Sequence, residues 1–401
     1  MVRGRIAVAG GGIAGMAAAI ALREAGFEVA VHERERRLDA AGSALGLHPG
    51  AVLALRRLGL DRQVVAAGEE VRTWEFLSWD GERIGGWPQS KVSEAMGAPS
   101  VTVLRSQLQR ALHAAVRPED LRLGSIATGY REAADGVELL LADGTRDRAQ
   151  LLIAADGLHS VVRRQTLGDA PLRRAGFTSW RAVSNVAPAG LRPSTARQVL
   201  GTGATFGSWP LTGGRTYWVA TLADELASEL GADDRTRVHG AAEHAGLLSA
   251  FRAAPEPTAE LVAATPPDQV VRTPILDRLP TPGWATARTL LVGDAAHPMV
   301  PTTGQGAGQA LLDAVALADL LQDADLGDSG DLARRLRAFE EQRFPVVTAA
   351  AQAAWHSGRL HHELDPEQVE LRNRRFRATT EAEWLSRVGL SPVSDTARRS
   401  A

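Results

Sequence analysis

The first sixty residues alternate short apolar runs with longer stretches in which apolar positions recur at helical spacing. The β-branched runs Arg5–Ala9 and Glu28–His32 predict buried strands. The Ala- and Leu-rich stretch Ile13–Ala25 predicts a helix that ends at Gly26, and Pro49–Leu60 predicts another helix. A strand, a glycine-rich turn, a helix and a second strand make a βαβ unit, which indicates a parallel sheet.

The pattern changes in the middle of the chain, where strict alternation and turn dipeptides predict antiparallel strands. Three strand pairs are expected, namely Arg72–Trp79 with Glu82–Trp87, Val137–Ala142 with Leu151–Ala155, and Thr202–Pro210 with Arg215–Thr221. Helical spacing returns at three stretches, namely Ser106–Val116, Arg235–Arg252 and Gln309–Leu321, and Leu290–Val292 resembles a further buried strand. From Asp331 onward the chain is mostly helical and charged, and it ends in a polar tail.

This order of elements predicts an α/β fold in two discontinuous domains. Residues 1–71, 98–172 and 279–330 are expected to form a Rossmann-like nucleotide-binding domain. Residues 72–97 and 173–278 are expected to form an inserted antiparallel β-sheet domain that binds substrate, and residues 331–401 a C-terminal helical segment.

Composition excludes several functions. The net charge of −2 provides no field that would gather nucleic acid or an anionic membrane surface. The chain has no cysteine, which excludes disulfides and thiolate chemistry. No apolar stretch reaches the roughly 20 residues of a membrane helix, and the glycines near the N-terminus favour fold over signal peptide. We therefore expect a cytoplasmic protein, either a monomer or a homodimer.

A glycine motif follows the first predicted strand. Gly10, Gly12 and Gly15 match G-x-G-x-x-G, in which the glycines permit a tight turn, approach of a pyrophosphate and close packing of helix on strand. Glu33 ends the second strand, eighteen residues after Gly15, near the position expected for an acid that binds ribose hydroxyls. The motif predicts a bound dinucleotide but does not by itself distinguish NAD from FAD.

Two later segments distinguish them. Asp156-Gly157 follows an apolar run, and Gly293-Asp294-Ala295-Ala296-His297 precedes Pro301-Thr302-Thr303-Gly304-Gln305-Gly306. With the first motif, these residues resemble the fingerprints of the FAD-dependent aromatic hydroxylases, and in particular the smaller members such as urate hydroxylase and zeaxanthin epoxidase. The resemblance extends over about 300 residues and makes the Rossmann-like domain an FAD-binding domain.

The resemblance also implies roles for individual residues. Asp294 would accept hydrogen bonds from the ribityl chain, the start of the helix after Gly304 would meet the pyrimidine edge of the flavin, and Arg105 would contact the phosphates or the ribityl chain. Pro301 lies at the family's position beside the flavin and is the catalytic candidate. The full set expected at the cofactor is Gly10, Gly12, Ala14, Gly15, Glu33, Arg34, Gly46, Arg105, Ala127, Asp156, Asp294, Gly304, Gln305, Gly306 and Ala307.

Some residues carry a structural interpretation instead. Arg163 is expected to be structural, and His159 and His297 are not expected to transfer protons. His361 and His362 lack partners at a metal-binding spacing, so we expect them at the surface and expect no metal site. Leu312 stands before Asp313 where the family commonly has Glu-Asp, and we attach no function to that departure.

The chemistry implied by the resemblance is monooxygenation. NADH or NADPH would reduce FAD and leave, O2 would form a C4a-hydroperoxide on the flavin, and one oxygen atom would pass to an aromatic or polycyclic small molecule. Candidates for the pocket wall are Trp180, Thr205, Trp209 and Tyr217. Thr205 stands where urate hydroxylase has a catalytic arginine, which argues against an anionic substrate such as urate. The tryptophans and the lack of an obvious cationic clamp favour a neutral substrate.

Alternatives remain at this level. A flavin-dependent halogenase would need a catalytic lysine and a W-x-W-x-I-P segment, but Lys91 lies in an outlying hairpin region and Trp74 and Trp79 have the wrong spacing. A dehydrogenase or reductase of the same fold would not transfer oxygen, and a non-catalytic flavin-binding protein would not oxidise NAD(P)H. Hydroxylation, epoxidation and Baeyer–Villiger insertion stay open among monooxygenases.

Overall fold

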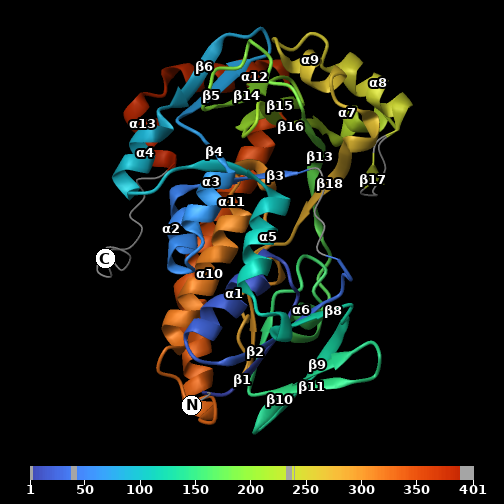
Figure 1. Cartoon of the computed structure of the whole chain (residues 1–401). Coiled ribbons are helices and arrows are strands. Elements are labelled where there is room, and N and C mark those ends of the chain that lie inside the picture. Colours follow the sequence, from blue (N-terminus) through green and yellow to red (C-terminus); the bar gives the residue numbers. More distant parts are fainter. Residues whose placement is uncertain (1–2, 38–42, 232–236, 239, 389–401) are drawn as a thin grey trace.

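The computed structural model describes residues 3–37, 43–231, 237–238 and 240–388, and it contains two large sheets (Figure 1). The first is a five-stranded parallel sheet in the order β19-β12-β1-β2-β8. Most residues of these strands are buried and apolar, because other elements cover both faces of such a sheet. They are β1 (Arg5–Ala9), β2 (Glu28–Glu33), β8 (Leu121–Leu123), β12 (Leu151–Ala154) and β19 (Thr289–Leu291).

Helices pack around this sheet. The central pair is α1 (Ile13–Glu24) and α10 (Gly306–Leu321), which contact each other along much of their length. The small side chains of α1, including Ala17, Ala18 and Ala21, are buried and permit this close approach. The others are α2 (Pro49–Arg57), α3 (Asp61–Ala67), α5 (Arg105–Ala115) and α6 (Val161–Leu167). The strands and helices predicted for the first sixty residues are confirmed.

Two small antiparallel sheets flank the first. One contains β3 (Ala44–Leu47), β7 (Val101–Leu104) and β4 (Glu69–Glu70), and the other β9 (Ala127–Ala133), β10 (Gly136–Leu141) and β11 (Arg146–Ala149). The predicted pairing of Val137–Ala142 with Leu151–Ala155 is wrong. β10 pairs with β11, while Leu151–Ala154 is a strand of the parallel sheet. The intervening β11 is polar, so its strand character is not evident from apolar alternation.

The second large sheet has eight strands in the order β17-β18-β13-β16-β15-β14-β5-β6. The predicted hairpins β5–β6 and β15–β16 are confirmed as antiparallel pairs, and β14 is parallel to β5. The strands are β5 (Thr73–Ser78), β6 (Arg83–Trp87), β13 (Arg173–Ser184), β14 (Thr195–Leu200), β15 (Ala204–Leu211), β16 (Arg215–Ala223), β17 (Arg237–Val238) and β18 (Val271–Asp277).

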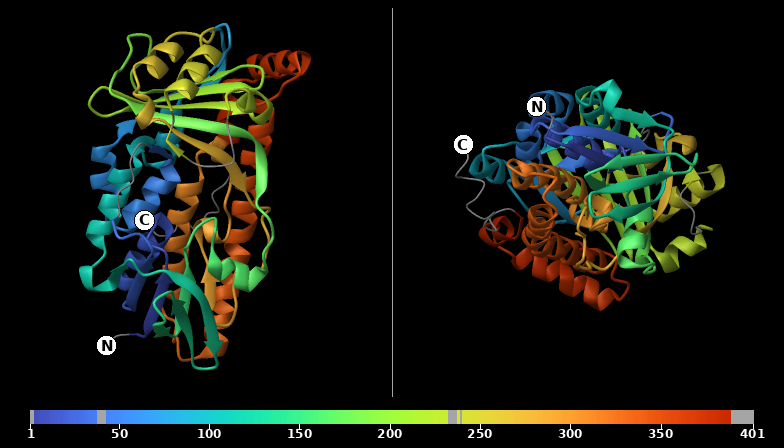
Figure 2. Two further views of the ribbon diagram at one scale, coloured as in Figure 1. Left: turned by 90° about the vertical axis from the view of Figure 1, so that its right-hand side faces the viewer. Right: turned by 90° about the horizontal axis from the view of Figure 1, so that it is seen from below.

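The two faces of this sheet have different neighbours. The outer face is covered by α7 (Asp224–Glu229), α8 (Ala241–Ala250) and α9 (Thr258–Ala263), with a core that includes Phe206, Trp218 and Phe251 (Figure 2). The opposite face, here called the inner face, is directed toward the five-stranded half of the molecule. The helix predicted over Arg235–Arg252 begins only at Ala241, and Arg237–Val238 is a strand.

A long helix connects the two halves. α11 (Ser329–His361) has 33 residues, which corresponds to about 50 Å at 1.5 Å per residue, and it runs alongside α10 toward the eight-stranded sheet (Figure 1). α12 (Pro366–Ala378) and α13 (Glu381–Val388) follow it, and α4 (Gln89–Met96) follows β6. The predicted polar tail lies outside the described residues. Within them, no helix has the length and apolar character needed to cross a membrane.

Candidate active site

The glycine loop joins β1 to α1, and two of its glycines are fixed by packing. Gly10 has φ +102°, and a Cβ there would lie 2.3 Å from the Ala155 carbonyl oxygen. A Cβ on Gly15 would lie 1.9 Å from the Gly10 oxygen. A Cβ on Gly12, by contrast, would meet no protein atom within 4 Å. Gly12 caps α1 without a side-chain hydrogen bond, so the helix N-terminus faces open space suited to a pyrophosphate.

Glu33 lies beside this loop. One carboxylate oxygen accepts the Gly11 N–H at 2.6 Å, and the other accepts the Glu35 N–H at 2.9 Å. The carboxylate therefore holds the loop in place. Arg34 is exposed and pairs with Glu35 at 3.4 Å, while Ala127 is the first residue of the neighbouring strand β9. A ribose contact by any of these residues stays a prediction.

Asp156 stabilises the start of α6. Its Oδ2 accepts the Val161 N–H at 2.9 Å and so caps the start of α6, whereas its buried Oδ1 has no hydrogen-bond partner among the described residues. Burial raises the pKa of the Asp156 carboxyl. Gly10 packs directly against it, since a Cβ on Gly10 would be 3.0 Å from the Asp156 Cα. The first and second motifs are therefore adjacent.

The third motif meets the first as well. A Cβ on Gly293 would lie 2.7 Å from the Cβ of Ala14 and 3.6 Å from that of Ala310. The buried Arg163 holds the loop after Gly293 in place, because it donates hydrogen bonds to the carbonyl oxygens of Ala295 and Ala296 at 3.1 and 2.8 Å. The structural role expected for Arg163 is confirmed. Segments from three parts of the sequence therefore lie side by side, and the place where they meet is called the groove below.

Asp294 projects from this loop with its side chain exposed to solvent, and it makes no hydrogen bond to the described residues. Protein nevertheless surrounds it on most sides, and this desolvation raises its pKa, while the charges of His297 and Arg105 act in the opposite direction. Arg105 begins α5 and is exposed, directly after β7, whose partner strand β3 carries the exposed Gly46. A carboxylate without a partner fits a ligand that offers hydroxyl donors.

The loop from Pro301 to Ala307 forms the other side of the groove. Gly304 adopts φ +65°, and α10 begins at Gly306 after Gln305, whose side chain does not cap the helix. The first N–H groups of α10, which include those of Gly306 and Ala307, are thereby left for a ligand. His48 braces the loop: burial lowers its pKa, and its Nε2 lies 3.2 Å from the Thr303 carbonyl oxygen, to which it donates. Pro301 is exposed at the start of this loop.

A buried network beneath the groove was not anticipated from the sequence. Asp313 accepts hydrogen bonds from His297 Nε2 at 2.6 Å, the Gly293 N–H at 2.9 Å and Arg343 Nε at 2.8 Å. Although burial opposes ionisation, His297 and Arg343 hold the pKa of Asp313 at about 2. The one available signal was polar spacing, since Gln309 and Asp313 lie one turn apart on the otherwise apolar α10. His297 is occupied in this network, in agreement with its expected non-catalytic role.

The pocket-wall candidates separate between the two faces of the eight-stranded sheet. Thr205 pairs with Thr221, and Trp209 pairs with Tyr217, so these four side chains share the inner face. Trp180 does not: it pairs with Ala220, is fully buried under α8 and α9, and donates to Glu243 at 3.1 Å. The assignment of Trp180 to the pocket is therefore corrected to the outer-face core.

Positive charge is present near the inner face, contrary to the sequence argument for a neutral substrate. Arg181 lies on this face and donates to Thr273 Oγ1 at 3.0 Å. Burial raises the pKa of Tyr217, and the charges of Arg181 and Arg105 partly offset that rise. β7, which leads directly into Arg105, also contacts β15, so the inner face of this sheet lies close to Arg105, whose charge also acts on Asp294. The apparent lack of a cationic clamp no longer excludes an acidic substrate.

His361 and His362 are not at the surface, as the sequence led us to expect. His361 is 4% exposed, and burial lowers its pKa to about 3; burial lowers the pKa of His362 to about 4. His362 stacks on Phe177 with ring centroids 3.9 Å apart. Apolar segments from distant parts of the chain cover both rings. No three His, Asp or Glu side chains within the described ranges are grouped so as to hold a metal ion.

His362 determines the direction of the hydrogen bonds that join it to Thr221 and Thr205. Its Nδ1 lies 2.8 Å from the Gly358 carbonyl oxygen and so carries the hydrogen, which leaves Nε2 as an acceptor. Thr221 donates to Nε2 at 2.7 Å, so Thr205 must donate to Thr221 at 2.7 Å. The Thr205 oxygen is therefore left to accept, and not to donate, toward any further partner.

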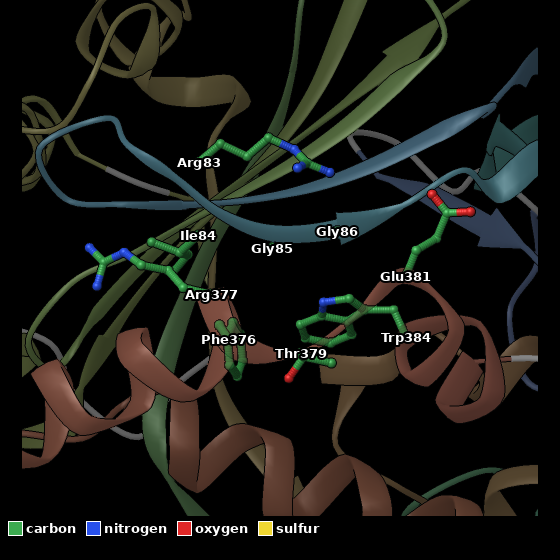
Figure 3. Close-up of a pocket in the computed structure, with 9 residues that line it drawn as sticks. All are labelled: Arg83, Ile84, Gly85, Gly86, Phe376, Arg377, Thr379, Glu381 and Trp384. Carbon is green, nitrogen blue, oxygen red and sulfur yellow. The ribbon is translucent and has the colours of Figure 1, made fainter.

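A separate hollow opens at the edge strand β6, under α12 and α13 (Figure 3). Ile84, Gly85, Phe376, Arg377 and Trp384 are among its lining residues. None of the predicted cofactor or substrate residues lines it. It is distinct from the groove described above.

Comparisons with known proteins agree with this geometry. Residues 3–354 match the family model described as "FAD binding domain". The aurachin C monooxygenase/isomerase of Stigmatella aurantiaca is 38% identical over 92% of this chain and 97% of its own length. The 3-amino-4-hydroxybenzoate 2-monooxygenase of Streptomyces cremeus is 35% identical over 98% of both chains.

Solved structures give the same result. Klebsiella pneumoniae HpxO complexed with FAD and uric acid superposes with a TM-score of 0.84 and 26% identity, over 96% of this chain and 95% of the other. Family match, relatives and groove geometry agree: the chain belongs to the FAD-dependent aromatic hydroxylases and is an FAD-dependent monooxygenase.

Proposed function

We propose that this monooxygenase oxygenates a planar aromatic or polycyclic small molecule that binds between the groove at Asp294 and the inner face of the eight-stranded sheet. The observation that carries the proposal is the position of Arg105. Arg105 directly follows β7, which contacts β15 of the eight-stranded sheet, and its charge acts both on Asp294 in the groove and on Tyr217 on the inner face. A molecule between these two residues would therefore contact both the cofactor site and the sheet.

The chain's own groups fit FAD along the whole groove. The open N-terminus of α1 at Gly12 suits the pyrophosphate, and Glu33, beside the same loop, would contact the adjacent ribose. Asp294 offers an unpartnered carboxylate to the ribityl hydroxyls. The free N–H groups at the start of α10 would bind the pyrimidine edge, where a helix N-terminus stabilises negative charge. Bound FAD would supply the redox chemistry, accepting hydride from NADH or NADPH and activating O2.

The inner face supports an aromatic substrate that carries a hydrogen-bond donor. Trp209 and Tyr217 are half-buried, with ring centroids 5.7 Å apart, and present aromatic surface. Thr221 donates its hydrogen to His362, and Thr205 donates its hydrogen to Thr221. The Thr205 oxygen can therefore accept a hydrogen bond from a ring hydroxyl or N–H. An electron-rich ring with such a substituent is the type that flavin-based oxygen transfer attacks. Pro301 stays our candidate for the residue beside the reacting atoms.

Labelled oxygen tests the proposal. FAD-loaded protein is mixed with NADH or NADPH and 18O2 in the presence of 2-naphthol, 4-hydroxyquinoline or 3-amino-4-hydroxybenzoate. We expect at least one compound to stimulate NAD(P)H oxidation and to gain one 18O atom, measured by mass spectrometry. Ligand-stimulated oxidation that yields only an unlabelled product or hydrogen peroxide would favour a reductase instead. No stimulated oxidation with any of the three would count against a planar aromatic substrate.

A further inference from the structure

The indole of Trp209 lies across the inner face directly above Gly207. A Cβ built on Gly207 would be 2.3 Å from Cη2 and 2.6 Å from Cζ3 of that indole. Real Cβ atoms do not approach so closely, so any side chain at position 207 would force the ring to move. Because Gly207 does not have a positive φ, its backbone conformation makes no demand for glycine. The position is left bare only on account of the ring.

Neighbouring rings hold the indole in that place. Trp209 contacts Trp74 edge-on at 6.1 Å between ring centroids, and Tyr217 is at 5.7 Å. Trp74 in turn stacks on Trp87 at 5.4 Å, with the planes 6° apart. The end of the indole that carries Cη2 and Cζ3 lies above Gly207. The space above Gly207 therefore determines how close to the sheet this end can lie. Val219 pairs with Gly207 and adds only a small side chain beside it.

The indole also borders the site. Trp209 is half-buried and touches Tyr217, and its strand β15 contacts β7, which leads directly into Arg105 beside the groove. An indole that lies flat against the sheet leaves the most space for substrate between the inner face and the groove. A side chain at position 207 would push the indole away from the sheet and into that space.

We propose that Gly207 is a specificity-determining residue, which lets the Trp209 indole lie on the sheet as the roof of the substrate site and so selects planar, fused-ring aromatic molecules. The proposal rests on the proposed function, because it takes the inner face as the substrate side. A fused ring overlaps an indole over more area than a single ring does, and aromatic stacking grows with that overlap.

The test measures binding to FAD-loaded protein by the change in the flavin absorbance spectrum, with 2-naphthol as the fused-ring probe and phenol as the single-ring probe. We expect wild-type protein to bind 2-naphthol about tenfold more tightly than phenol. Gly207→Ala should reduce that ratio to about threefold or less, mainly by weakening 2-naphthol. Trp209→Phe should lower the ratio as well, because it removes the indole, and adding Gly207→Ala to that variant should lower it no further, because phenylalanine lacks the Cη2 and Cζ3 atoms that clash.

The same sheet offers a matched control. A Cβ on Gly201 would lie 2.5 Å from Cε3 of Trp79, whose ring contacts Phe251 on the α8 side. Gly201→Ala therefore displaces a tryptophan to a similar extent but away from the site, and the probe ratio should stay at its wild-type value. The proposal is overturned if wild-type protein shows no fused-ring preference, if Gly207→Ala keeps it, if Gly207→Ala lowers the ratio further in the Trp209→Phe variant, or if Gly201→Ala abolishes it. Binding decides these outcomes, whereas 18O transfer decides the proposed function.

Discussion

At Gly12 a side chain would enter open space and would strain nothing inside the protein. The neighbouring Gly10 and Gly15 differ, because a Cβ on either would strike backbone atoms. The spacing of the three glycines predicted the loop, but only the structure separates the two glycines needed for folding from the one left for a ligand.

We predict that Gly12→Val prevents FAD retention while the chain still folds. The valine would block the approach of the pyrophosphate to the N-terminus of α1, and loss of two charged hydrogen bonds of about 1.5 kcal/mol each raises the FAD dissociation constant on the order of a hundredfold. Flavin absorbance of the purified protein measures retention, and circular dichroism checks the fold. Gly240→Val, at another open glycine on the far side of the eight-stranded sheet, should stay yellow. A yellow Gly12→Val protein would refute the assignment.

The sequence could not predict which face of the sheet each strand residue occupies. Trp180, Thr205, Trp209 and Tyr217 all lie in strands, but whether a strand turns its odd or even positions inward depends on what packs against the sheet. α8 and α9 fill the outer face and take Trp180 into their core. Only the other three remain candidates for the pocket wall.

Between elements, the strongest connection in the site is the buried charge network of Asp313. It joins the loop at Gly293, α10 and α11 through His297 and Arg343. A carboxylate with a pKa of about 2 contributes stability that is complete above its usual pKa and is lost as pH falls from about 4 toward 2.

We predict that Asp313→Asn destabilises the protein by about 3–5 kcal/mol, because it leaves the buried Arg343 without its charge partner. FAD affinity should fall as well, since the loop that carries Asp294 loses its anchor. Urea unfolding and flavin fluorescence measure the two effects. The control is Asp319→Asn on the same helix, where an exposed pair with Arg57 is worth no more than about 1 kcal/mol. Equal effects of the two substitutions would contradict a special role for the network.

Across the whole molecule, α11 connects the five-stranded half to the eight-stranded sheet. It contacts α10 and the Pro301 loop, and its end buries His361 and His362 against the inner face. The residues that surround the two imidazoles come from β5, β13, β14, β16 and α12, and the charges of Arg372 and Asp224 act on His362.

We predict acid-sensitive stability from these two histidines. Their folded-state pKa values of about 3 and 4 lie below the usual 6.5, so the unfolded chain binds more protons as pH falls from 6.5 to 4. The free energy of unfolding should therefore decline over that range, by up to about 1.4 kcal/mol per pH unit for each histidine. The combined His361→Gln and His362→Gln variant should show a flatter decline in urea unfolding. His159→Gln, at an exposed site, should reproduce the wild-type decline.

The sequence by itself determined the nucleotide-binding half, because a glycine loop, an adjacent strand and an adjacent helix act through neighbours along the chain. It also predicted that three distant motifs serve one flavin, and their side-by-side packing at Gly10, Ala14 and Gly293 agrees with that. Only the tertiary structure decided which sheet face meets the groove, that Arg105 and Arg181 bring positive charge near Tyr217, and that His361 is buried and His362 half-buried. These depend on contacts between residues far apart in sequence, where no local pattern carries the information.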